Sequence, residues 1–107
     1  DLILLTGGLG PTSDDITKPA LCQYFGCGLK TDEKVLDHIT GFFVRRNRPM
    51  LEANKKQAEI PTISEALFNR LGTAPGIWIE RKGKIFISLP GVPYEMKEIL
   101  TLEHFLV

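Results

Sequence analysis

The sequence lacks an excess of either charge, a long apolar run and a framework of cysteines. Its 13 basic and 13 acidic side chains cancel, which argues against general electrostatic attraction to nucleic acid or to an anionic membrane. No apolar run approaches the ~20 residues that cross a bilayer. Two cysteines, Cys22 and Cys27, provide neither a disulfide framework nor the spacing of a structural zinc site. We therefore expect free thiols in a reducing, cytoplasmic compartment, with no nucleic-acid or membrane partner.

The first residues have the pattern of a buried strand. The continuous apolar run Leu2–Leu5 predicts a strand over residues 2–6 that is buried on both faces, as in a parallel sheet. Such a strand needs neighbours, so we expect residues 1–107 to form a single, incomplete domain that lacks its first βα units. An incomplete sheet leaves strand edges open to pairing. We therefore expect a homo-oligomer.

Patterns along the rest of the chain predict an α/β protein. Val35, Leu36 and Ile39 begin a stripe at helical spacing, and Lys82-Gly83 separates two runs rich in β-branched and aromatic residues. Residues 64–71 fit a short helix and an extended segment equally well. A helix is predicted from Thr17, whose hydroxyl caps it, to Phe25. The other predicted elements are helices over 31–43, 50–58 and 94–100 and a hairpin of strands 77–80 and 84–89.

A glycine-rich loop follows the first predicted strand, in the stretch TGGLGPTSDDIT. Gly7, Gly8 and Gly10 let the backbone approach a ligand without an intervening Cβ. Backbone N–H groups before a helix attract anions, above all phosphate. The G-G-x-G spacing differs from the P-loop and from the dinucleotide-binding fingerprint. The loop is therefore either a phosphate site or a tight structural turn.

Two adjacent carboxylates, Asp14 and Asp15, end this loop. A carboxylate beside a phosphate site repels the ligand unless a cation intervenes, and Mg²⁺ commonly bridges carboxylates and substrate phosphates. The pair therefore indicates a divalent metal, or a carboxylate that binds a sugar or base. The alternative is that one aspartate caps the following helix.

A second loop, over residues 89–93, also lies between a predicted strand and a predicted helix. If both strands share a sheet, the two loops open onto the same edge and form two walls of one cleft. The nearby basic residues are either a phosphate-facing patch or a solvated helix face; they are Arg45, Arg46, Arg48, Lys55 and Lys56.

The stretch TGGLGPTSDDIT resembles the signature T-G-G-[TL]-G-x-x-x-x-D-x-T of the molybdenum-cofactor-biosynthesis, or molybdopterin-binding, domain superfamily. Leu9 and the Asp14-Asp15 pair are similar to one branch, the amino-terminal domain of the competence/damage-inducible protein CinA. Three further blocks agree with that branch: residues 54–58, 69–76 and 89–96. The resemblance spans nearly the whole chain.

This resemblance implies a three-layer α/β/α domain with a mostly parallel sheet, to which the predicted hairpin is added. It implies binding of molybdopterin or a nucleotide-like ligand and, in the CinA branch, divalent-metal-dependent hydrolysis of ADP-ribose pyrophosphate. Asp15 matches the functional aspartate and is the expected catalytic residue, with Asp14 and Asp15 as metal ligands. The expected ligand-binding residues are Thr6, Gly7, Gly8, Gly10, Thr12, Thr17, Pro90, Gly91 and Pro93. The alternatives are a non-hydrolytic molybdopterin-binding module and an inactive fragment.

Overall fold

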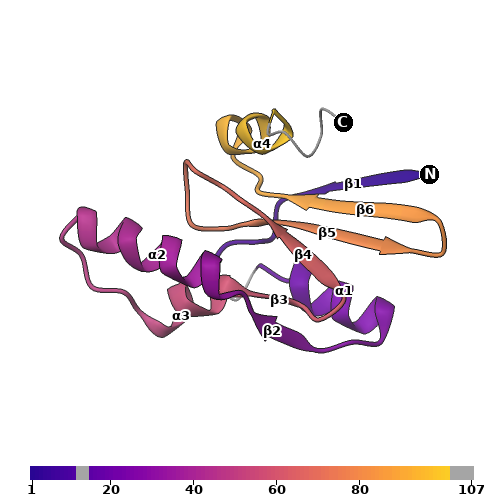
Figure 1. The fold of residues 1–107 in the computed structure, drawn as a ribbon, viewed down its shortest axis with the longest axis horizontal. Coiled ribbons are helices and arrows are strands. Elements are labelled where there is room, and N and C mark those ends of the chain that lie inside the picture. Colours follow the sequence, from indigo (N-terminus) through magenta and orange to yellow (C-terminus); the bar gives the residue numbers. More distant parts are fainter. Residues whose placement is uncertain (12–14, 102–107) are drawn as a thin grey trace.

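The computed structural model describes residues 1–11 and 15–101. Figure 1 shows a four-stranded sheet that carries a smaller unit of helices and two short strands. The elements are β1 (Leu2–Thr6), α1 (Thr17–Phe25), β2 (Leu29–Thr31), α2 (Glu33–Arg45), α3 (Glu52–Lys55), a 3₁₀ turn η1 (Lys56–Ala58), β3 (Glu59–Pro61), β4 (Ser64–Leu67), β5 (Gly76–Arg81), β6 (Lys84–Leu89) and α4 (Pro93–Leu100). Predicted residues Thr12 and Asp14 lie outside the described residues.

The main sheet has the strand order β1-β6-β5-β4. Among the described strands of this sheet, only β1 and β6 run parallel, with Thr6 opposite Leu89, whereas β6–β5 and β5–β4 are antiparallel. The α/β class is confirmed, but the expected mostly parallel sheet is wrong. The predicted hairpin lies inside the main sheet, and its two-residue turn reverses the chain at Lys82 (φ 51°) and Gly83 (φ 75°). A parallel neighbour would need a crossover of a dozen or more residues at that point.

Helices cover both faces of this sheet, as expected for a three-layer arrangement. Alternate strand residues point to opposite faces, so Ile77 and Ile79 pack with Leu21 of α1. On the other face, Ile87 packs with Ile99 of α4. Figure 1 shows α4 above the sheet and α1 below it. None of the helices within the described ranges is long and apolar enough to cross a bilayer.

The smaller unit contains two strands that the sequence did not predict. β2 and β3 pair antiparallel, and Ile60 of β3 joins the core beneath the sheet. Each strand has three residues, too few to show a periodic pattern. The helix expected over 50–58 is likewise shorter, because α3 ends at Lys55 and continues as η1. The open choice for residues 64–71 is resolved as strand β4 and a following loop.

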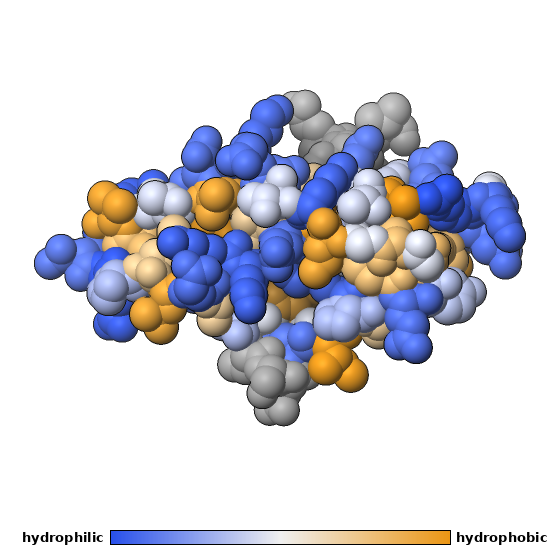
Figure 2. All heavy atoms as spheres, turned by 90° about the horizontal axis from the view of Figure 1, so that it is seen from below, coloured by the Kyte–Doolittle hydropathy of each residue, from blue (hydrophilic) through white to orange (hydrophobic). Residues whose placement is uncertain are grey.

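Strand β1 occupies the outer position of the sheet. Leu2 is 58% exposed and Leu4 is 51% exposed, so the expectation of a strand buried on both faces is wrong for the described chain. The reason is that, among the described residues, none of the three buried hydrophobic clusters includes a side chain of β1, so the faces of this strand are left largely uncovered. On the face shown in Figure 2, apolar side chains (orange) lie scattered among polar ones (blue).

Candidate functional site

The loops that follow β1 and β6 meet at one edge of the sheet. Because these neighbouring strands run parallel, both loops leave at the same end. Gly7 N–H donates to Leu89 O at 2.8 Å and joins the two loops. Together with residues 71–74 they line a cleft of about 700 Å³. The structure therefore brings together seven of the predicted residues in its lining: Gly7, Gly8, Gly10, Asp15, Pro90, Gly91 and Pro93.

The first wall of the cleft, residues 7–10, depends on glycine geometry. Gly7 (φ 86°) and Gly8 (φ 72°) are both left-handed, a conformation that glycine adopts without steric cost. Thr17 holds this shape, since its hydroxyl donates to Gly7 O at 2.9 Å and its N–H to Gly8 O at 3.2 Å. A Cβ at Gly8 would collide with the Thr17 hydroxyl. Thr17 therefore holds the loop in this conformation. The prediction that its hydroxyl caps helix α1 is wrong, because α1 has no side-chain cap hydrogen bond.

Two further glycines make room for specific neighbours. A Cβ at Gly10 would stand 2.8 Å from Oδ2 of Asp15, so the missing side chain leaves space for that carboxylate. A Cβ at Gly91 would stand 3.3 Å from the Cα of Gly7. The two loops thus approach each other through backbone atoms, and Asp15, which is half-buried, lies in the wall beside them.

A further wall of the cleft comes from the segment 69–76, of which residues 71–74 line the cleft. This segment is called the second wall below, and Asn69 organises it. This side chain is 2% exposed, and its Nδ2 donates to Ala74 O and to Glu95 Oε1, both at 2.8 Å. Its Oδ1 accepts from Leu71 N at 3.1 Å. Asn69 therefore shapes the loop and also holds the Glu95 carboxylate of α4 in the lining of the cleft. The sequence showed Asn69 only as part of a matching block, because its burial and its contact with Glu95, 26 residues away, are not visible in the local pattern.

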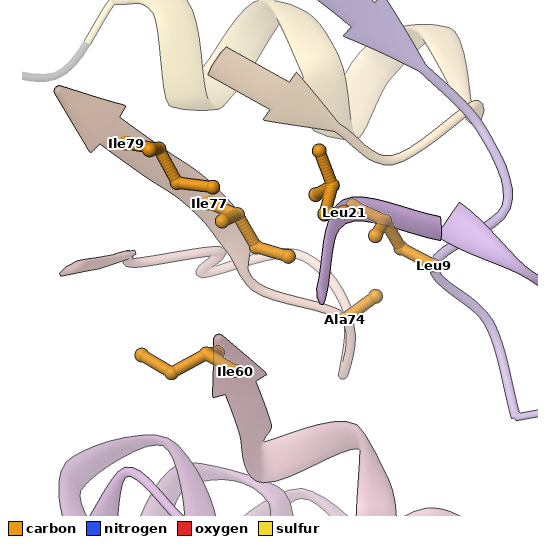
Figure 3. Packing of buried hydrophobic residues seen from close by; sticks show 6 residues of the cluster. All are labelled: Leu9, Leu21, Ile60, Ala74, Ile77 and Ile79. Atoms are coloured by element: carbon orange, nitrogen blue, oxygen red, sulfur yellow. The ribbon is translucent and has the colours of Figure 1, made fainter. Parts of the chain in front are cut away.

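Both walls are anchored in the same hydrophobic core. Leu9 of the first wall and Ala74 of the second are buried with Ile60, Ile77 and Ile79 beneath the sheet. Figure 3 shows these side chains together with Leu21 of α1. The separation of the walls is consequently fixed by close packing.

Aromatic side chains also line the cleft. Phe42 of α2 and Tyr94 of α4 are both part of its lining. The guanidinium of Arg46 stacks over the Phe42 ring, 3.5 Å from its centroid. Of the basic residues considered in the sequence analysis, Arg46 thus contacts an aromatic ring that lines the cleft. Flat rings of this kind can pack against a planar heterocycle.

The remaining predicted residues lie elsewhere. Thr6 and Thr17 line a neighbouring apolar groove beside α1. Within residues 1–11 and 15–101, no three His, Cys, Asp or Glu side chains are close enough to hold a metal ion by themselves. Cys22 and Cys27 are free thiols, as expected. Besides Asn69, the sequence argument gave no role to Gln57, whose amide is buried in the lining of the cleft.

Comparison with known proteins agrees with this arrangement. The profile of the family described as "Probable molybdopterin binding domain" matches residues 1–106. The chain belongs to this molybdopterin-binding domain family. The resemblance inferred from the glycine loop is thereby confirmed.

Similar members of the family carry the name CinA. The chain is 52% identical over 104 residues to a CinA-like protein of Flavobacterium psychrophilum and 54% identical over 100 residues to one of Cytophaga hutchinsonii. These matches cover 96% and 94% of the chain and 25% and 24% of the relatives, so the chain spans about a quarter of their length. A crystal structure of CinA from Thermoplasma acidophilum, described as of unknown function, superposes with a TM-score of 0.81 at 39% identity. That match covers 94% of this chain and 58% of the other.

Proposed function

We propose that the cleft binds a phosphorylated ligand of the nucleotide or pterin type, with ADP-ribose as the first candidate. In a longer protein of the relatives' kind, we propose that this domain supports divalent-metal-dependent hydrolysis of the ADP-ribose pyrophosphate. The observation that carries the proposal is the meeting of a left-handed glycine loop and the Asp15 carboxylate in one cleft. Strand-end loops of this kind are where α/β proteins bind ligands.

Each part of the cleft suits one part of such a ligand. The backbone of the glycine loop would hold phosphate oxygens, because glycine lets N–H groups approach an anion closely. Phe42 and Tyr94 would pack against the heterocycle. The volume of about 700 Å³ lies within the usual ~300–1,000 Å³ range of small-molecule sites.

The carboxylates of the cleft fit a Mg²⁺ ion. Magnesium is commonly bound through one or two carboxylates together with substrate phosphates. Asp15 would hold it beside the phosphates, with Asp14 as a second proposed ligand, and Glu95 places another carboxylate in the same lining. The bound ion would neutralise phosphate charge. Asp15 is the proposed catalytic residue, and through the Mg²⁺ ion that it holds it would fix the position of the pyrophosphate.

The proposal also includes the setting of the protein. Free thiols at Cys22 and Cys27 suit a reducing compartment, and we therefore propose a cytoplasmic location.

Leu2 and Leu4 on the outer strand give the chain an exposed apolar edge. Such an edge favours pairing with another strand, so we propose a homo-oligomer.

A second candidate function is binding of molybdopterin without hydrolysis. The description of the matching family favours it. The same glycine loop would serve the phosphate, and Asp15 would contact polar groups of the ligand. Binding of this kind would be insensitive to EDTA.

Calorimetric titration with ADP-ribose, with and without Mg²⁺, tests the proposal. We expect binding that requires Mg²⁺ and that weakens by about tenfold or more in Asp15→Asn, since about 1.4 kcal/mol corresponds to each factor of ten. Asp37→Asn is the matched control, because Asp37 is exposed on α2 and outside the cleft lining. Equal affinities for the wild type and Asp15→Asn would contradict the role of Asp15. Binding unaffected by EDTA would favour the molybdopterin alternative.

A further inference from the structure

The side chain of Gln57 is a buried polar group in the wall of the cleft. It is 3% exposed, and within the described part of the chain its Oε1 has no hydrogen-bond partner. Buried polar side-chain atoms in proteins are nearly always hydrogen-bonded, because water has been removed from them. An unsatisfied amide oxygen in a ligand cleft therefore requires an explanation.

Gln57 lies between two hollows. It lines the main cleft and also a smaller cavity of about 310 Å³. Asp15 and Gly10 line the same two hollows, so Gln57 and Asp15 stand in the partition between them. Open volume on both sides lets the terminal amide turn toward a group that enters the cleft.

The backbone that carries Gln57 is firmly held. Ala58 is fully buried with Val35 and Ile39 of α2, and its carbonyl accepts from Asp32 N at 2.9 Å. On the other side, the Lys18 ammonium donates to Lys56 O at 2.8 Å. With both neighbours fixed, the backbone of Gln57 stays in the wall, and its terminal amide remains within reach of the cleft.

We infer that Gln57 Oε1 accepts a hydrogen bond from an O–H or N–H group on the non-phosphate part of the ligand. The inference rests on the proposed function and adds a specificity-determining residue to it. Phosphate oxygens that carry no proton only accept hydrogen bonds, so Mg²⁺-bound pyrophosphate at a pH where it is fully ionised cannot satisfy this oxygen. A sugar hydroxyl or a heterocycle N–H can. A site with a buried acceptor rejects compounds that lack the donor, because binding them leaves the acceptor unpaired.

The test compares two ligands on one variant. ADP-ribose and inorganic pyrophosphate, each with Mg²⁺, are titrated calorimetrically into the wild type, Gln57→Met and the control Gln23→Met. Methionine has a similar unbranched shape but is at most a weak acceptor, and Gln23 is exposed on α1. We expect Gln57→Met to weaken ADP-ribose binding by about tenfold, with pyrophosphate binding unchanged and Gln23→Met equal to the wild type for both ligands.

The outcomes separate this inference from the proposed function. Equal losses for the two ligands in Gln57→Met, or no loss for either, would overturn the role of Gln57 alone. If the wild type binds neither ligand, the proposed function is overturned and the inference falls with it.

Thermal unfolding without ligand supplies a second readout. If Oε1 is unsatisfied in the free chain, Gln57→Met should melt at or above the temperature of the wild type. A fall of more than about 5 °C would mean that the amide is already satisfied, which would overturn the inference.

Discussion

The two walls of the cleft are shaped by opposite means. In residues 7–10 the shape comes from missing side chains, since Gly7 and Gly8 are left-handed and Thr17 binds their carbonyls. In residues 69–76 it comes from one side chain, since the amide of Asn69 reaches Leu71, Ala74 and Glu95. The stability of the first wall should therefore be sensitive to a side chain added at Gly8. The stability of the second wall should be sensitive to loss of the hydrogen-bond donor of Asn69.

The largest effect is expected for Asn69→Asp. The new carboxylate would face two acceptors, Ala74 O and Glu95 Oε1, in a position that is 2% exposed. We expect the free energy of unfolding to fall by about 3 kcal/mol at neutral pH, measured by urea denaturation. This repulsion raises the pKa of the introduced carboxyl, so the loss should shrink as the pH falls through that pKa and the donor returns.

The control for this change is Asn47→Asp, because Asn47 is exposed on the surface. It should alter stability by less than about 0.5 kcal/mol. A loss at Asn69→Asp no larger than at this control would mean that a single side chain does not organise the second wall.

The next largest effect is expected for Gly8→Ala. The substitution places a Cβ against the Thr17 hydroxyl at a φ of +72°, and strain of this kind costs about 2 kcal/mol of unfolding free energy. Chemical denaturation measures it. Gly28→Ala is the matched control, because a Cβ there meets nothing within 4 Å. Equal stabilities of the two variants would contradict the glycine requirement of the first wall.

The smallest effect is expected for Arg70→Met, at the exposed side of the second wall. Arg70 Nε lies 2.6 Å from Glu98 Oε1, and this hydrogen bond lowers the pKa of Glu98. In the variant, that pKa should return to its ordinary range, as an NMR titration would show. Stability at neutral pH should hardly change, because exposed ion pairs contribute little.

The sign of the pH dependence follows from the lowered pKa. Glu98 adds stability above the pKa of its unfolded state, and this contribution is lost as the pH falls through the folded value. The Arg70→Met variant should lack this acid-linked loss. An unchanged Glu98 titration would show that Arg70 is not the cause of the shift.

Local patterns were sufficient to predict part of this site. The apolar run of β1, the glycines after it and the strand Lys84–Leu89 are each encoded within a few residues, and the structure has them at the expected positions. The sheet was expected to be mostly parallel because the resemblance implied it and because the apolar run of β1 is typical of a parallel sheet. The β5–β6 hairpin is local and was predicted, but its place inside the sheet depends on the pairing of β6 with β1, which is distant in sequence. Asn69 and Gln57 were overlooked for a similar reason: Asn69 meets Glu95 26 residues away, and burial decides the importance of both amides.

Strand β1 carries the first wall, yet it has one strand neighbour within the described chain and two largely exposed leucines. Segments with few buried contacts open before the rest of a protein unfolds. The bond from Gly7 N–H to Leu89 O continues the ladder between β1 and β6 into the cleft. A ligand that holds the glycine loop would therefore slow amide exchange along a strand it never touches. Under the proposed function, occupancy of the cleft would therefore shift the opening equilibrium of this strand toward the closed state.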